Sequence, residues 1–271
     1  MIIDSGKPCN RQTPRSHNLV MHDGWKPADM LAAAKKDVLA YPNVQLLNAT
    51  VTAVTGTSNN FEVSVDDSDT TYFAKKIIVA AGIKDIFPDI KGFAECWGIS
   101  IIHCPYCHGY EYRDEPTGIF ANGDKGHDLA KLISNWTKYL TVFTNGQPTF
   151  TQEQEDAILR NGIKIIETPV SGVEHDNGYV KKVNLQNGES VSLSAMYARL
   201  PFVQHTDVPA KLGCEFTEQG HIKTDMMQKT SIPGVFSCGD AASPMRAVSA
   251  AIASGTMAGV AAGKEILEER F

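Results

Sequence analysis

Residues 76–82 have the sequence Lys-Ile-Ile-Val-Ala-Ala-Gly, a continuous apolar run that ends in small residues. A strand buried on both faces of a parallel sheet has this pattern, whereas a half-exposed strand alternates polar and apolar residues. The small residues at its end, Ala81 and Gly82, leave room for a ligand to approach the backbone. The run therefore predicts a parallel α/β fold with a ligand near the end of this strand.

A second parallel α/β unit is expected after residue 92, because strand and helix patterns alternate there. The predicted order is strand 118–123 entering a tight turn, helix 128–136, strand 140–144, helix 152–160 and strand 163–167. This βαβαβ order is typical of a parallel sheet with crossover helices. Asn177-Gly178 and Asn187-Gly188 predict two-residue hairpin turns in a β insertion that follows.

The remaining segments complete a first unit around the 76–82 strand. We expect the end of a buried strand at 1–4, an irregular stretch at 5–26, a helix from Pro27 to the stop at Pro42, an antiparallel meander at 44–73, a strand and turn at 235–240, and a final helix at 247–270. Because it follows the second unit, the last helix is expected to return to the first.

Composition narrows the class of protein. The 271 residues have 42% hydrophobic and 21% charged side chains, which suits two modest globular domains. A net charge of -6 with dispersed Lys and Arg argues against a nucleic-acid partner. No run approaches the roughly 18–20 apolar residues of a membrane span, and no secretory signal pattern is present, so we expect a cytoplasmic protein without membrane partners. Six cysteines are too few for a disulfide-stapled scaffold.

The most informative motif is Cys104-Pro105-Tyr106-Cys107-His108. Two residues between cysteines permit a reversible disulfide, and a thiol acidified by its surroundings becomes the attacking thiolate. A protonated His108 would acidify the pair and could shuttle the proton that dithiol oxidation releases. The motif predicts a redox site with Cys104, Cys107 and His108 as its catalytic residues.

Three other interpretations of the same motif stay open at this point. Cys-x-x-Cys-His is also the attachment signature of c-type haem, although the surrounding pattern is α/β and no export signal is present. A zinc knuckle needs a second ligand pair, which His103, Cys96 and Cys214 do not form at usable spacing, so no metal is expected. The two thiols could also be buried apolar groups without chemistry.

The order of several motifs resembles the low-molecular-weight thioredoxin reductases over nearly the whole chain. The motifs are Ile-Val-Ala-Ala-Gly at 78–82, Cys-Pro-Tyr-Cys at 104–107, Thr-Ser-Ile-Pro-Gly-Val-Phe-Ser-Cys-Gly-Asp at 230–240, and Ala-Val-Ser-Ala-Ala-Ile-Ala-Ser-Gly at 247–255. The Cys-x-x-Cys-His-Gly-Tyr-Glu variant is most similar to the branch with bacterial thioredoxin-reductase-like proteins and fungal dithiol oxidases.

The resemblance implies two Rossmann-like, three-layer domains in a homodimer. Residues 1–90 and 201–271 would form a discontinuous FAD-binding domain, and 91–200 an NAD(P)-binding-like domain that carries the cysteine pair. The implied activity is a flavin-dependent thiol-disulfide oxidoreductase acting on a small dithiol or disulfide or on a thioredoxin-like protein. Cys107 would be the thiol next to the flavin, and Cys104 would exchange with substrate.

The resemblance also implies a set of flavin contacts. Asp4 would bind the adenosine ribose, Gly239 and Asp240 would meet the ribityl and pyrophosphate part, and Ala247 and Val248 would approach the flavin ring. Ala81 and Gly82 join this set, as do Asn10, Arg11 and Gln12, which lie where the family's loop lines the flavin and phosphates. Without the resemblance, Asp4 would be interpreted as a turn former at the end of a strand, and Asp240 as a helix cap.

The start of the sequence departs from the family pattern. Dinucleotide folds place a strand, a Gly-x-Gly-x-x-Gly turn and a helix before the acidic strand end, whereas Asp4 almost begins this chain. We therefore expect a truncated first domain whose missing central strand exposes apolar neighbours and sheet edges. A degenerate protein without flavin that acts as a binding partner is the alternative function.

The expected nicotinamide site also departs from the family pattern. Residues 121–127, Ala-Asn-Gly-Asp-Lys-Gly-His, keep only part of the usual glycine spacing, and residues 142–146, Val-Phe-Thr-Asn-Gly, contain no arginine for a 2'-phosphate. The sequence thus argues against NADPH. Oxygen as acceptor for a dithiol oxidase and a protein donor such as ferredoxin are the alternatives.

Overall fold

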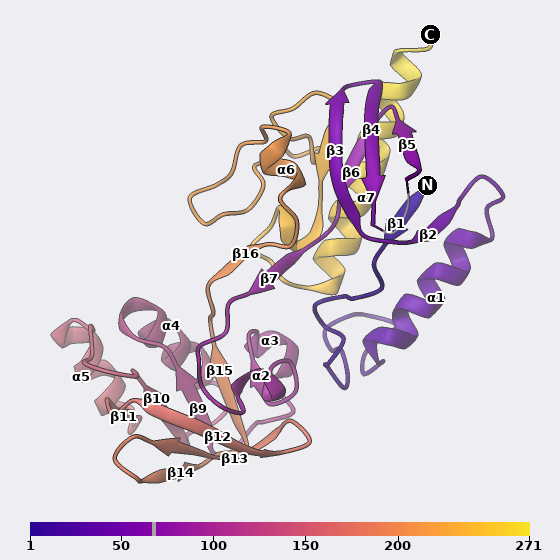
Figure 1. Cartoon of the computed structure of the whole chain (residues 1–271). Coiled ribbons are helices and arrows are strands. Elements are labelled where there is room, and N and C mark those ends of the chain that lie inside the picture. Colours follow the sequence, from indigo (N-terminus) through magenta and orange to yellow (C-terminus); the bar gives the residue numbers. More distant parts are fainter. Residues whose placement is uncertain (67–68) are drawn as a thin grey trace. The chain divides into compact units, whose positions relative to one another are not determined.

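The computed structural model describes residues 1–66 and 69–271 (Figure 1). Two compact units are present. The first contains Met1–Arg11, Ala28–Asp85 and Phe202–Phe271, and the second contains Gln12–Pro27 and Ile86–Pro201. The α/β class predicted from the sequence is confirmed. The segment from Gln12 to Pro27 groups with the second unit, although the sequence placed it in the first.

The second unit is built on a five-stranded sheet in which all four strand pairings are parallel. Its strand order is β11 (Lys164–Ile166), β10 (Leu140–Phe143), β9 (Thr117–Phe120), β15 (Ala195–Ala198) and β8 (Ile101–Ile102). An antiparallel meander follows β11 in the chain and consists of β12 (Val170–Asp176), β13 (Tyr179–Leu185) and β14 (Ser190–Ser192). The helices are α2 (Phe93–Cys96), α3 (Pro105–His108), α4 (Gly123–Ile133) and α5 (Gln152–Arg160).

Two apolar cores lie on opposite faces of this sheet. Met196 packs with Val183 of β13 in one core, whereas the next residue, Tyr197, packs with Leu129 of α4 and Ile158 of α5 in the other. Neighbouring residues of a strand point to opposite faces, so a strand between two cores must be apolar at every position. The unit therefore has three layers, with α4 and α5 on one face and the meander on the other (Figure 1).

Two sequence predictions in this unit need correction. Helix α4 begins at Gly123 rather than at residue 128, because the Asn122 side chain accepts a hydrogen bond from the Gly123 N–H and caps the helix. The Asn177-Gly178 turn is a two-residue hairpin with both residues at positive φ, as expected. The turn at Asn187-Gly188 is longer, since the Leu185 N–H bonds to the Glu189 carbonyl and encloses three residues.

The first unit contains several small sheets rather than one large one. β1 (Ile2–Asp4) pairs in parallel with β2 (Leu46–Asn48), and β6 (Ile77–Val79) pairs in parallel with β17 (Val235–Ser237). β3 (Val51–Thr57), β4 (Asn60–Val65) and β5 (Thr71–Ala74) form the expected meander, and β7 (Ile83–Asp85) pairs with β16 (Phe202–Gln204). The helices are α1 (Pro27–Leu39), α6 (Val208–Lys211), the 3₁₀ turn η1 (Gly239–Ala241) and α7 (Val248–Glu268).

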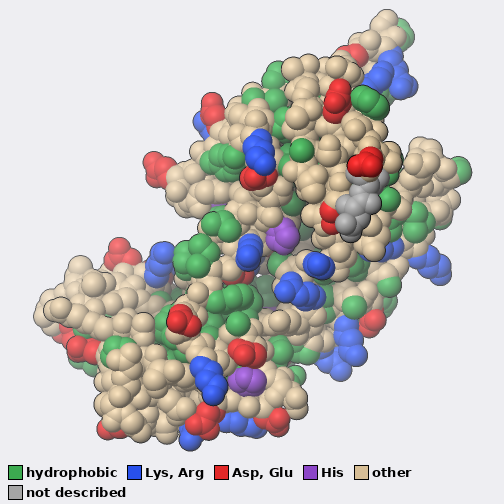
Figure 2. All heavy atoms as spheres, viewed as in Figure 1, with side chains coloured by type: hydrophobic (Ala, Val, Ile, Leu, Met, Phe, Trp, Pro, Cys, Tyr) green, Lys and Arg blue, Asp and Glu red, His purple; other side chains and the backbone are tan. Residues whose placement is uncertain are grey.

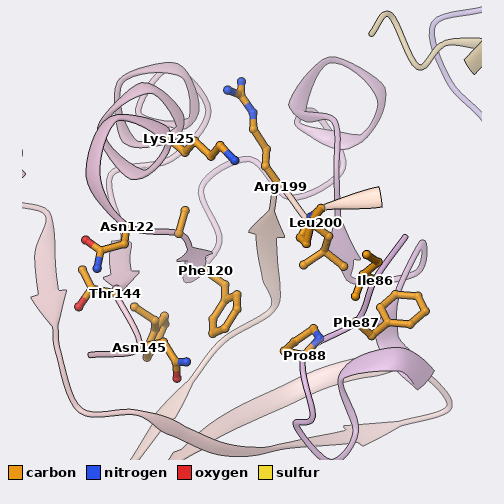
Figure 3. Close-up of a pocket in the computed structure, with 13 residues that line it drawn as sticks. Ile86, Phe87, Pro88, Phe120, Asn122, Lys125, Thr144, Asn145, Arg199 and Leu200 are labelled. Atoms are coloured by element: carbon orange, nitrogen blue, oxygen red, sulfur yellow. The ribbon is translucent and has the colours of Figure 1, made fainter. Parts of the chain in front are cut away.

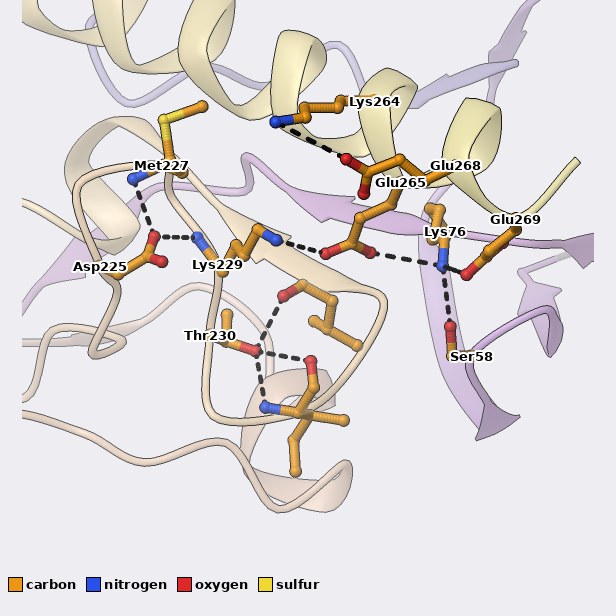
Figure 4. A network of polar contacts seen from close by, with 12 residues as sticks. Ser58, Lys76, Asp225, Met227, Lys229, Thr230, Lys264, Glu265, Glu268 and Glu269 are labelled. Atoms are coloured by element: carbon orange, nitrogen blue, oxygen red, sulfur yellow. Dashed lines mark hydrogen bonds and ion pairs between the residues drawn. The ribbon is translucent and has the colours of Figure 1, made fainter. Parts of the chain in front are cut away.

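The final helix packs on β17, as Ala258 and Ala261 share a core with Phe236. Its last turns are also tied to the sheet by Lys76, whose side chain is 4% exposed and contacts Glu265 and Glu269 (Figure 4). The expectation that the 76–82 strand is buried on both faces is wrong. Ile78 of β6 is 42% exposed and Ile2 of β1 is 41% exposed.

Acidic and basic side chains are interspersed on the face drawn in Figure 2. This mixture matches the dispersed charges of the sequence. Within residues 1–66 and 69–271, no helix has the length and apolar character needed to cross a membrane.

Candidate active site

The cysteine pair lies at the start of α3 in the second unit. Cys104 is the N-cap residue, Pro105 opens the helix, and the Cys107 N–H donates to the Cys104 carbonyl at 3.2 Å. This turn brings the two Sγ atoms to within 2.9 Å of each other. The two sulfurs are therefore close enough to form a disulfide with each other.

Two contacts hold α3 in place. Gly109 ends the helix, and a Cβ at this position would meet the Trp136 ring at 2.6 Å, so glycine allows this close approach. The Tyr197 hydroxyl donates to the His108 carbonyl at 3.4 Å. Because Tyr197 is a core residue of β15, the redox turn is anchored directly to the parallel sheet.

His108 is half-buried directly after Cys107. Burial lowers the pKa of its imidazole, the nearby Glu111 opposes this shift, and His17 adds to it. The net direction favours a neutral imidazole, which can accept a proton from a thiol. Of the two roles expected from the sequence, the structure therefore suits His108 as a proton shuttle more than as a protonated imidazole that acidifies the pair.

Three of the other cysteines are core residues. Cys96, Cys214 and Cys238 are buried, and burial raises the pKa of each thiol, to about 11 for Cys96. A raised pKa keeps a thiol protonated and unreactive. In the part of the chain that the structure describes, no three His, Cys, Asp or Glu side chains are grouped as metal ligands.

The predicted flavin residues of the first unit meet at the carboxyl ends of β6 and β17. Val79 pairs with Ser237 in the parallel register, so Ala81 and Gly82 leave the sheet at the same edge as Gly239. Gly82 has φ +70°, and a Cβ there would face open space. The backbone at Gly82 therefore borders open space.

The start of α7 lies beside this edge. The Gly239 N–H, at φ +66°, donates to Ser254 Oγ of α7 at 3.0 Å. Ala247 is the N-cap residue before Val248 and provides no side-chain cap for the helix. The first N–H groups of this 21-residue helix therefore give a positive end that favours a negative group.

Asp240 belongs to a cluster of charged side chains at the same place. Burial raises the pKa of its carboxyl, and the Arg246 guanidinium, 3.9 Å away, counteracts this shift. Arg246 also forms two 2.8 Å bonds to the buried Asp85. Arg246 and Asp85 are positioning candidates that the sequence analysis missed, since their pairing connects β7 to a distant loop.

The other predicted flavin residues are more scattered. Asp4 accepts from the Gly6 N–H and forms a 2.9 Å ion pair with Lys35, which lowers the pKa of its carboxyl. Asn10 is half-buried, and the exposed Arg11 donates to the Pro8 carbonyl. Gln12 lies in the second unit, where its amide donates to the carbonyls of residues 94 and 97.

These residues fit part of a flavin nucleotide. An open glycine edge, the uncapped start of α7 and Asp240 suit the ribityl and flavin end. The 271 residues contain no Gly-x-Gly-x-x-Gly turn, so a pyrophosphate finds no glycine cradle of that kind among them.

A cavity of about 440 Å³ opens at the carboxyl ends of β9, β10 and β15 in the second unit (Figure 3). This is where open α/β sheets bind ligands. Lys125 of α4 and Arg199 after β15 reach toward it (Figure 3). The sequence analysis looked for a cation at 142–146 and missed both, although Arg199 follows a predictable buried strand and could have been found from its place at a strand end.

Comparison with known protein families decides the class. The model of the pyridine nucleotide-disulphide oxidoreductase family matches residues 1–255. The chain belongs to this family. Its fold is that of two-domain dinucleotide-binding oxidoreductases of the thioredoxin-reductase type, as the resemblance implied.

Individual relatives agree with this assignment. Thioredoxin reductase tcpT of Claviceps purpurea (strain 20.1) is 29% identical over 99% of the chain and 87% of its own length. Thioredoxin reductase sirT of Leptosphaeria maculans is 30% identical over 95% of the chain and 84% of its own length. The crystal structure of putative thioredoxin reductase TrxB from Bacillus anthracis superposes with a TM-score of 0.93 at 29% identity, over 99% of this chain and 90% of that one.

Proposed function

We propose that this oxidoreductase exchanges two electrons between FAD and a substrate disulfide or dithiol through Cys104 and Cys107. The carrying observation is the approach of the Cys104 and Cys107 Sγ atoms to 2.9 Å, directly before a half-buried histidine, in a member of a disulfide oxidoreductase family. The substrate class is a small disulfide or dithiol or a thioredoxin-like protein, since both share the sulfur chemistry that the pair can perform.

The exchange steps balance with the groups of this site. The Cys104 thiol gives its proton to His108, and the thiolate attacks a substrate disulfide, whose first sulfur leaves and takes up a proton. The Cys107 thiol then loses its proton and attacks the Cys104 sulfur, and the second substrate sulfur leaves and is protonated. Two electrons pass to the substrate, and the reverse order oxidises a substrate dithiol.

Binding of FAD is proposed at the edge formed by the ends of β6 and β17 and the start of α7. Ala81, Gly82, Gly239 and Asp240 would meet the ribityl part, and the α7 N-terminus at Ala247 and Val248 would lie against the flavin ring. Asp4, Asn10, Arg11 and Gln12 are the further contacts that the resemblance implies. Bound FAD would supply or accept the electron pair of the cysteines.

The first experiment is a visible absorbance spectrum of the protein with and without added FAD, followed by anaerobic addition of NADPH and then of a dithiol. Bleaching by dithiol and not by NADPH supports a dithiol oxidase or a protein-fed reductase, and bleaching by NADPH supports a pyridine-nucleotide donor. C104S and C107S variants should lose exchange with a disulfide substrate, and retention of full exchange in either would defeat the proposal. Light scattering on the same samples tests the proposed homodimer.

A further inference from the structure

A further titratable side chain, His17, reaches the redox turn from the irregular segment at residues 12–27. The segment is closed by a short antiparallel bridge, in which the Ser16 N–H donates to the Trp25 carbonyl and the Gly24 N–H donates to the Ser16 carbonyl, both at 2.8 Å. Arg15 adds a bond to the Gly24 carbonyl. His17 is therefore held by a closed loop of the same unit that carries the cysteine pair.

His17 lies between two carboxylates. Its Nδ1 is 3.2 Å from Asp23 Oδ2, and its Nε2 is 3.4 Å from Glu111 Oε1. Its ring meets the His108 ring edge-on, with centroids 6.0 Å apart. The Asp23 side chain is 63% exposed, whereas those of His17 and Glu111 are 21% and 33% exposed. His108, His17 and Asp23 thus form a row that ends at the largely exposed Asp23 carboxylate.

We infer that His17, with Glu111, is a positioning and proton-relay residue that acts on the cysteine pair through His108. The inference deepens the proposed function and rests on it. Each thiol-disulfide exchange moves a proton between a cysteine and a substrate sulfur, and the half-buried His108 needs a partner to which it can pass that proton. An imidazole with a carboxylate at each nitrogen can take a proton from one side and release it on the other.

The groups that face this path are all ionisable and belong to the same unit. Glu111 raises the pKa of His108 and His17 lowers it. The Tyr197 hydroxyl donates a hydrogen bond to the His108 carbonyl. Asp23 and Glu111 face His17, and the Asp23 carboxylate also accepts from the Asn18 N–H at 2.8 Å. Asp23 is fixed by two bonds, so it keeps His17 oriented toward Glu111.

The test compares H17Q with H22Q. Gln at residue 17 can keep a hydrogen bond from its amide nitrogen to Glu111 but cannot carry a proton. His22 lies in the same loop and packs on the Trp25 ring, with centroids 4.4 Å apart, so H22Q is the matched control. Two disulfide probes are used with the reduced full-length protein. Hydroxyethyl disulfide has alkyl leaving thiols that need a proton, whereas the leaving thiolates of 5,5'-dithiobis(2-nitrobenzoate) do not.

We expect H17Q to slow exchange with hydroxyethyl disulfide about tenfold, a fraction of what a direct acid-base group supplies, and to change the aromatic probe much less. The pH profile with the alkyl probe should flatten, and added imidazole should restore the rate of H17A. H22Q should behave as the unchanged protein does. Equal slowing of both probes, or no rescue by imidazole, would mean that His17 only supports the loop and would overturn the relay.

The C104S and C107S variants separate the two proposals. If they abolish exchange while H17Q has no effect, the relay is wrong and the cysteine mechanism stands. If they leave exchange unchanged, the cysteine mechanism itself fails.

Discussion

The Asp85–Arg246 pair tests how the first unit is held together around the start of α7. Nη1 and Nη2 of Arg246 donate to the two carboxylate oxygens of Asp85 at 2.8 Å, and the side chains of Arg246 and Asp85 are 13% and 5% exposed. R246M keeps a long apolar stem but removes the cation from a buried carboxylate. Removing one partner of a buried pair costs about 3–5 kcal/mol, and partial access of water to Arg246 places the expectation at about 3 kcal/mol.

The free energy of unfolding that R246M loses should depend on pH in a defined direction. Burial raises the pKa of Asp240, and Arg246 restrains that rise. A carboxyl whose folded pKa lies above its unfolded value contributes stability that is present below the unfolded pKa and disappears as the pH rises through the folded pKa. Without Arg246 the folded pKa rises further, so the variant should lose less stability in mildly acidic buffer than in neutral buffer.

Urea unfolding followed by circular dichroism measures this difference. K211M is the matched control, because Lys211 forms a 2.8 Å pair with Asp207 on an exposed helix surface. Exposed pairs of this kind contribute less than about 0.5 kcal/mol. The reasoning is refuted if R246M costs no more than K211M, or if its loss grows on acidification.

Two further predictions concern stability and use the same unfolding measurement. K76M should cost about 2 kcal/mol, because the Lys76 side chain is 4% exposed and pairs with Glu265, whereas K264M at an exposed helical pair should cost less than about 0.5 kcal/mol; equal losses would contradict the role given to burial. G178A should cost more than G188A, since both glycines have positive φ but only a Cβ at Gly178 meets other atoms, Ile99 Cδ1 at 2.3 Å. Strain alone should cost about 1 kcal/mol in G188A, and a G178A variant as stable as G188A would contradict the steric argument.

Elements with local stop and start signals were predictable from the sequence. Helix α5 spans Gln152–Arg160 as expected, and Thr151 with Gln154 forms a capping box at its start. Helix α1 begins at Pro27, since proline is favoured at the first position of a helix. By contrast, β7 and β16 are three residues each and pair across more than a third of the chain, so no local pattern marks them.

The candidate site also contains residues that the sequence could predict and residues that it could not. The cysteine pair was predictable because both thiols and His108 are adjacent in one turn. His17 was assigned no role, since its approach to His108 depends on the closed loop at residues 12–27. A contact between residues so distant in sequence leaves no periodic or spacing signal in a single sequence.

The cavity of the second unit shows why a missing motif is weak evidence about a ligand. The sequence analysis argued against NADPH because residues 121–127 and 142–146 lack the usual glycines and arginine. In the fold, Asn122 Oδ1 accepts from the N–H groups of Gly123 and Thr149, so the first donor of α4 is already used. Positive charge comes instead from Lys125 and Arg199 on different elements. An anion held there would meet two side-chain cations, and cations reach their places through the fold and not through a local motif.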